Sequence, residues 1–242
     1  RMLKRATFAI CLMLIFVFTS VYSQVSMHGG KGLYRVLSAE PVNPTDIFVS
    51  GTFSSYFIKT GPQTMAKYYS AHLNSTVGLA KYLEVFVDIV PYQDDQYHLF
   101  GRFGDTHLAL KYLTPLATDA FKLGIMGFYK FPTAVSANVR YEVFSTDKPG
   151  WGAKGLVTFD LINVMPSFPT KLDLNLGYID HNIYDQYFNS KIDQLFFGAG
   201  VKTSIRSVQA YVEYSGEIFI NNPSQVDFKQ NSIRITPGFR FM

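Results

Sequence analysis

The sequence predicts an all-β protein, an antiparallel transmembrane β-barrel of about ten strands. Three observations carry this prediction. Segments with alternating apolar and polar residues recur along the chain, the longer connections fall on one side, and aromatic residues make up 16% of the composition. Alternation places apolar side chains on one face of a strand and polar ones on the other. In a membrane barrel the apolar face meets lipid, and aromatic girdles lie at both interfaces.

Ten segments of alternating character have about the length that a tilted strand needs to cross a bilayer. The first of them, residues 46–59, places Val49 and Phe53 on one face and Ser50 and Thr52 on the other. An even strand number is what single-chain bacterial barrels require. The predicted strands are residues 46–59, 67–79, 82–90, 105–113, 121–131, 154–162, 171–178, 192–205, 208–219 and 232–242.

The connections between these strands differ in length. Bacterial barrels alternate short periplasmic turns with longer external loops. If the first strand runs outward, every external connection but the first is longer than every periplasmic one, which favours a barrel over a soluble β-sandwich. The external connections are roughly residues 60–66, 91–104, 132–153, 179–191 and 220–231, and the periplasmic ones are 80–81, 114–120, 163–170 and 206–207.

Two details depart from the regular pattern. Residues 138–143 alternate within a long connection and could form a further hairpin, so a barrel of twelve strands is an alternative. Pro237 removes one backbone donor from the last strand, which predicts a bulge or an unpaired position. We expect the last strand, residues 233–242, to close the barrel by pairing with residues 46–59.

The amino-terminal residues predict secretion. Three basic residues precede an uncharged apolar run, and small or polar residues follow it. This is the pattern of a signal peptide, and the run is shorter than the ~20 residues that a spanning helix needs. We therefore divide the chain into a signal peptide (1–23), a periplasmic lead-in segment (24–45) and the barrel (46–242).

Removal of the signal peptide changes the charge balance. The chain has 22 Lys and Arg against 18 Asp and Glu, and three basic residues lie in the signal, so 19 against 18 would remain. This near-neutral balance predicts no nucleic-acid partner. The only cysteine, Cys11, lies in the signal, so a mature chain would contain neither a disulfide nor a thiol nucleophile. No local spacing of metal ligands is evident, and we expect no cofactor.

With these residues in view, the chain resembles the outer-membrane β-barrel proteins of Gram-negative bacteria, in the broad sense that includes small OmpA-like and OmpW-like barrels. The ending Gly238-Phe239-Arg240-Phe241-Met242 is similar to the assembly signal of such barrels, with Gly238, Phe239 and Phe241 carrying the match. It departs from the pattern by ending on methionine instead of an aromatic residue. Residues 32–40 look like a lead-in segment or plug.

The resemblance implies a membrane protein of the cell outer membrane. Its implied partners are outer-membrane lipid, periplasmic chaperones and the barrel-assembly machinery. No carboxyl-terminal peptidoglycan-binding domain is expected, so the chain alone would not tether the cell wall.

Charged residues recur on the predicted inner face of the barrel. They could select ions or small solutes in a porin-like channel, or neutralise one another in a filled lumen. We favour the filled or narrow lumen, because a barrel of about eight strands is just wide enough for side chains to fill. The expected role is non-catalytic, structural or narrow transport, with external loops available for binding. The predicted lumen-lining residues are Glu84, Asp88, Lys111, Lys122, Asp160, Asp173, Lys202, Glu213, Arg234 and Arg240.

Two other classes of protein remain as alternatives. One is a soluble secreted β-sandwich that binds a ligand or partner. The other is an outer-membrane hydrolase, resembling proteases on this fold, although adjacent acids in a polar loop are usually only solvated. His72 and His107 are predicted to be lumen-filling polar residues. The hydrolase would use loop residues chosen from Asp94, Asp95, His98, Asp180 and His181.

Overall fold

A computed structural model describes residues 25–59, 65–95, 98–115, 118–134, 148–185, 190–220 and 232–241. The predicted signal peptide with Cys11, and residues 138–143, lie outside the described residues. No helix in the described ranges is long and apolar enough to cross a membrane.

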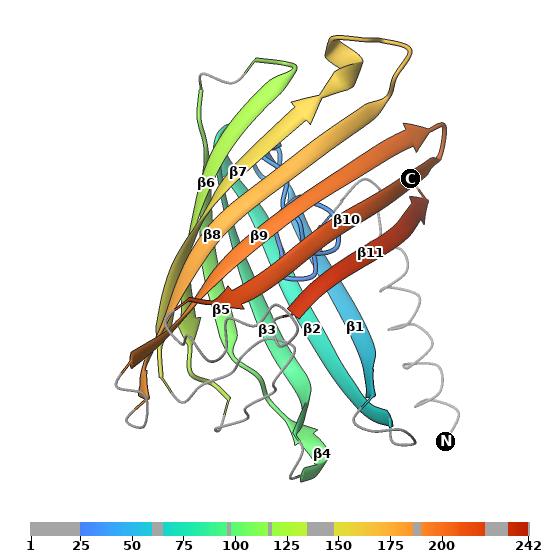
Figure 1. The fold of residues 1–242 in the computed structure, drawn as a ribbon. Coiled ribbons are helices and arrows are strands. Elements are labelled where there is room, and N and C mark those ends of the chain that lie inside the picture. The colour runs from blue at the N-terminus through green and yellow to red at the C-terminus, as the bar shows by residue number, and fades with distance from the viewer. Residues whose placement is uncertain are drawn as a thin grey trace, which may run out of the picture.

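The described strands form one antiparallel sheet that is curled into a half-barrel (Figure 1). The prediction of an all-β fold with about ten antiparallel strands is thus confirmed, and the described strands form one sheet instead of the two sheets of a β-sandwich. The elements are β1 (Ile47–Lys59), β2 (Met65–Ala80), β3 (Leu83–Asp95), β4 (His98–Arg102), β5 (Thr106–Leu113), β6 (Phe121–Phe131), β7 (Gly150–Asp160), the 3-10 turn η1 (Leu161–Asn163), β8 (Thr170–Asp185), β9 (Ser190–Ile205), β10 (Val208–Phe219) and β11 (Ser232–Phe241).

Each strand pairs with its neighbours in chain order, except that the short β4 pairs only with β3, which goes on to pair with β5. Alternation along the strands gives the sheet two unlike faces. In β5, Leu110 is 49% exposed on the convex face, whereas the next residue, Lys111, is fully buried on the concave face. The sheet therefore turns apolar side chains outward and charged ones inward.

The predicted closure of the barrel is not formed. β1 and β11 stand at the two ends of the strand order, and no pairing joins them over their described residues. The predicted bulge at Pro237 is also absent, because Pro237 pairs with Val212 of β10 in a continuous register. A strand at the edge of a sheet tolerates proline, since one of its sides has no ladder to complete.

The predicted rule of long external connections fails between β8 and β9. These strands reach Asp185 and Ser190, so their connection is shorter than the predicted 179–191 and shorter than the connection between β7 and β8 at the other end. The reason is that pairing continues beyond a register shift, with Tyr184 opposite Lys191.

Residues 25–45, the described part of the lead-in segment, lie against the concave face of the sheet (blue loops in Figure 1). Only two isolated bridges give the segment regular pairing. Its buried side chains include Met27, Leu33 and Val36. Leu37 and Ala39 complete a small apolar cluster with wall residues of β3, β5, β6 and β7. The core of the molecule thus lies between this segment and the sheet.

Candidate functional site

Glu40 is the centre of a charge network that joins the lead-in segment to the wall. Its carboxylate lies 3.4 Å from Lys31, 3.6 Å from Lys122 and 3.7 Å from Lys202, and Lys171 donates a hydrogen bond to it. Burial alone would raise the pKa of Glu40, but the surrounding lysine charges outweigh it and hold this pKa well below its usual range. Glu40 is therefore a carboxylate at neutral pH.

Further ion pairs lie in the wall itself. Lys111 is 2.7 Å from Glu84, and both side chains are fully buried. Lys111 also donates to the backbone carbonyl of Glu40, 3.1 Å away. Lys202 pairs with Asp173 at 2.9 Å. A buried charge needs such a partner, because removing one member leaves the other uncompensated.

Glu213 of β10 is buried and accepts hydrogen bonds from the backbone N–H groups of Arg35 and Val36, at 3.0 and 3.1 Å. Arg240 donates to the carbonyl of Gly32 at 2.9 Å. β10 and β11 therefore also hold the lead-in segment.

The structure places all ten sequence-predicted lumen residues on contacts of the concave side. Besides those above, Asp160 pairs with Lys171 at 2.8 Å, Arg234 lies 3.6 Å from Glu217, and Asp88 lies 3.2 Å from His72. Phe239 and Phe241, which carry the predicted assembly signal, are exposed on the convex face. Gly238 lies against Tyr211, where a Cβ atom would come within 2.3 Å of the ring.

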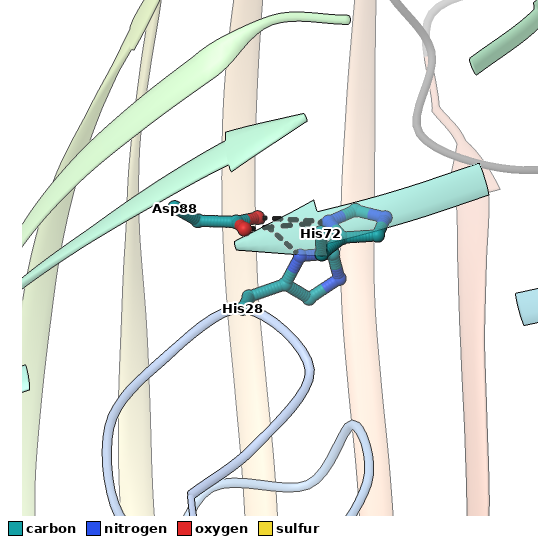
Figure 2. Close-up of side chains that lie close together, drawn as sticks. All are labelled: His28, His72 and Asp88. Carbon is teal, nitrogen blue, oxygen red and sulfur yellow. Dashed lines mark hydrogen bonds and ion pairs between the residues drawn. The ribbon is translucent and has the colours of Figure 1, made fainter. Parts of the chain in front are cut away.

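A cluster of two imidazoles and one carboxylate lies where the lead-in segment meets β2 and β3 (Figure 2). His28 Nδ1 is 3.0 Å from Asp88 Oδ2, and His72 Nδ1 is 3.2 Å from the same oxygen. His107 Nδ1 of β5 is 3.9 Å from it. Asp88 and His72 are buried, and His28 and His72 cross edge to face with ring centroids 5.2 Å apart. We call His28, His72 and Asp88 the histidine cluster.

Burial lowers the pKa of His28, although the hydrogen bond and charge of Asp88 partly oppose this effect. Metal ions bind the neutral form of imidazole, and a lowered pKa extends the pH range over which His28 takes that form. The ligand atoms of the histidine cluster all lie within 4.8 Å of one another. Two imidazole nitrogens and a carboxylate oxygen at this spacing can hold a divalent metal ion.

Sequence reasoning did not find the histidine cluster. The alternation places Asp88, His72 and His107 inside, but it predicts each of them only as a separate polar lining residue. His28 lies on a segment without periodicity, so no pattern indicates where its side chain points. The four residues come from three strands and one irregular segment, and only the fold brings them together.

The residues of the predicted hydrolase do not form one loop site. Asp180 and His181 lie within β8 and are buried, so their assignment to an exposed loop is wrong. His181 Nε2 lies 2.7 Å from Gln194, and its Nδ1 lies 3.2 Å from Lys130. Asp95 and His98 belong to β3 and β4, and three strands (β5, β6 and β7) separate β3 from β8 in the sheet. Like that of Asp94, their side chains are outside the described part of the structure.

A small cavity of about 110 Å³ lies beside the histidine cluster. His28 and His107 form one part of its lining, and Phe128, Lys154 and Glu217 are among the residues of the other. Apart from these polar groups the walls are mainly aromatic and aliphatic. The space suits ions, waters or a small solute and is far too small for a wide channel.

Comparison of the chain with protein-family models and with curated proteins gives no match. The fold class of the protein comes from the structure itself. It is an all-β, antiparallel half-barrel of ten sequential strands whose concave face is lined with paired charges and covered by the lead-in segment.

Proposed function

We propose that this chain is an outer-membrane β-barrel protein that acts without catalysis, in a structural or narrow transport role. The observation that carries the proposal is the reversed polarity of the sheet. Large apolar side chains cover its convex face, with Val49 70%, Leu176 60% and Ile235 71% exposed. Among the described residues, buried polar side chains outnumber buried apolar ones.

This distribution suits lipid and not water. Burying apolar surface stabilises a protein by roughly 25 cal/mol per Å², and monomeric soluble proteins rarely expose apolar patches above about 600 Å². Here apolar residues face outward on strands along the whole sheet, from Ile47 of β1 to Phe241 of β11. A hydrocarbon surrounding would remove this surface from water, and the sheet edges would then need to be joined, since hydrocarbon offers backbone groups no partners.

The filled concave face supports the structural form of this role over an open pore. The lead-in segment occupies the space that a channel would need, and its hydrogen bonds reach β2, β3, β7, β8 and β10. Ions or small solutes would be limited to the residual space beside Lys154 and Glu217. The connections at the end opposite the lead-in segment would remain available for binding, and lipid, chaperones and the barrel-assembly machinery would be the partners.

Extraction and gel mobility test the membrane assignment. We expect the protein to leave the membrane fraction only with detergent, and to migrate differently in unheated and boiled samples. Equal migration, together with solubility in detergent-free buffer, would contradict the proposal.

Conductance in a planar bilayer tests the filled lumen. We expect the wild-type protein to give no current steps or only small ones. Glu40→Lys places a fifth positive charge among four lysines, so it should displace the lead-in segment and enlarge the steps. Asp119→Lys, which makes the same charge change at an exposed turn, is the control. Large steps from the wild type would overturn the filled lumen.

A further inference from the structure

We propose that the histidine cluster binds a late first-row divalent metal ion of the Zn²⁺ type, and that this ion fastens the lead-in segment to the barrel wall. His28 is the ligand from the segment, and His72 and Asp88 are the ligands from β2 and β3. The inference concerns a site inside the lumen and goes beyond the proposed membrane role.

The spacing of the donor atoms fits a tetrahedral ion. Bonds of about 2.0–2.2 Å at tetrahedral angles separate ligand atoms by roughly 3.4 Å. The two imidazole nitrogens lie 3.0 and 3.2 Å from Asp88 Oδ2. All three donor atoms lie within 4.8 Å of one another, so rotation of the side chains about their χ angles would bring them to the spacing of a bound ion.

The chemistry of the donors selects the kind of ion. Imidazole nitrogens with one carboxylate suit zinc and its neighbours, whereas Ca²⁺ and Mg²⁺ prefer sites made of oxygen atoms. His107 Nδ1 is within reach of the cluster and has no hydrogen-bond partner among the described residues. It is therefore the candidate for a fourth ligand.

The charge of Asp88 gives an independent reason for a cation. Its side chain is fully buried, and in the described part of the chain only imidazoles lie within ion-pair distance of it. By contrast, the buried carboxylates of Glu84, Asp105 and Asp173 each have a lysine partner. A metal ion would give Asp88 a cation partner, as the lysines give these other carboxylates, and would use the nitrogen of His107 that makes no hydrogen bond in the described structure.

Binding should therefore be coupled to the position of the lead-in segment. An ion that binds only when His28 meets the wall residues favours the docked state by mass action. The segment also contains two trypsin cleavage sites, Lys31 and Arg35. Cleavage at these sites reports whether the segment leaves the wall.

The test uses the full chain in detergent, without a histidine tag, stripped with a chelator and dialysed. Titration with Zn²⁺ by calorimetry, and with Co²⁺ by absorption spectroscopy, should show one ion per chain. His28→Ala and Asp88→Asn should each weaken binding at least about tenfold, the lower end of what is seen even for residues that only support ligands. His181→Ala, which removes another buried lumenal histidine that contacts Lys130 and Gln194, should leave binding unchanged.

A second readout separates metal binding from folding. His28 lies outside the strands, so His28→Ala should keep the heat-dependent gel mobility of the wild type. Zn²⁺ should slow trypsin cleavage of the wild type at least tenfold and have no such effect on His28→Ala. Folded wild-type protein that takes up no ion would overturn the site, as would uptake that His28→Ala and Asp88→Asn leave intact. Gel mobility, which tests the membrane role, is scored separately.

Discussion

Glu40 organises much of the lumen with a single carboxylate. Four lysines from the lead-in segment, β6, β8 and β9 converge on it, so its removal leaves their charges close together without a common partner. Breaking a buried ion pair destabilises a protein by about 3–5 kcal/mol, and partial exposure of three of these lysines reduces the effect here.

We expect Glu40→Gln to lower the free energy of unfolding by roughly 2–3 kcal/mol, because glutamine keeps the shape but loses the charge. Guanidinium unfolding in detergent, followed by tryptophan fluorescence, measures the change. Asp119→Asn, at an exposed turn, should shift the midpoint by less than about 0.5 kcal/mol. Equal midpoints for wild type and Glu40→Gln would show that the network contributes no net stability.

The pH dependence of stability follows from the same residue. The pKa of Glu40 is lowered from an ordinary value of 4.5 by the lysine charges. A carboxyl whose folded pKa is depressed contributes stability above its unfolded pKa, and this contribution is lost as the pH falls from about 4.5 toward the folded value. Unfolding midpoints at pH 7, 5, 4 and 3 should therefore fall less steeply for Glu40→Gln than for the wild type.

Some of these residue contacts were predictable and others were not. The period of two along a strand is enough to place Glu84, Asp88 and Lys111 inside. It cannot say that Lys111 pairs with Glu84, because that depends on the register between β3 and β5. It says nothing of Glu40 or His28, since an irregular segment has no period from which a side-chain direction could be read.

Among the elements, the lead-in segment depends on glycines in the wall for close approach. Gly78 of β2 lies against the backbone of Asn43, where a Cβ atom would come within 2.1 Å of the carbonyl oxygen. Backbone hydrogen bonds from Thr45 N–H to the Gly78 carbonyl and from Gly78 N–H to the Asp46 carbonyl hold the two segments at this distance. A side chain at position 78 must therefore move the end of the segment.

We expect Gly78→Ala to destabilise the protein by about 1–3 kcal/mol, as overpacking of a close contact does. Gly127→Ala is the matched control, because a Cβ atom there meets nothing within 4 Å. That control should be neutral or slightly stabilising, since alanine restricts the unfolded chain. Guanidinium unfolding of both variants checks the difference, and equal stabilities would refute the close approach.

The end of β8 shows why the boundary of a strand cannot always be predicted from the sequence. Asp180-His181-Asn182 looks like the opening of a loop, and Asn182 does adopt a left-handed conformation with φ of 52°. In the folded sheet this turn-like residue becomes part of an irregularity between two paired stretches, and β8 continues to Asp185. The turn-like conformation that the sequence predicts is present at Asn182, but pairing with β9 determines where β8 ends.

At the scale of the whole molecule, the apolar convex face has a measurable consequence. Leu176, in β8, is 60% exposed and points away from the lumen. If this face meets lipid, an arginine at mid-depth should cost about 2–4 kcal/mol, and one near the interface about 0–1 kcal/mol.

We expect Leu176→Arg to reduce the stability of protein folded into phospholipid vesicles by this larger amount. Phe168→Arg, at a similarly exposed position (52%) in the connection between β7 and β8, should have little effect. Urea titration of the vesicle-folded protein, followed by tryptophan fluorescence, measures both. Equal effects of the two substitutions would argue against a lipid-facing band.

The bonds from Arg35 and Val36 to Glu213 join residues 178 and 177 positions apart in the chain. Because Glu213 lies in β10, these bonds cannot form until almost the whole sequence has been made. Contacts of such long range form late and slow folding, since a large loop must close before they form. The lead-in segment is synthesised before any strand, yet its contacts are completed only after β10 has been made. Until then, the backbone groups of Arg35 and Val36 lack the carboxylate that they bind in the folded protein.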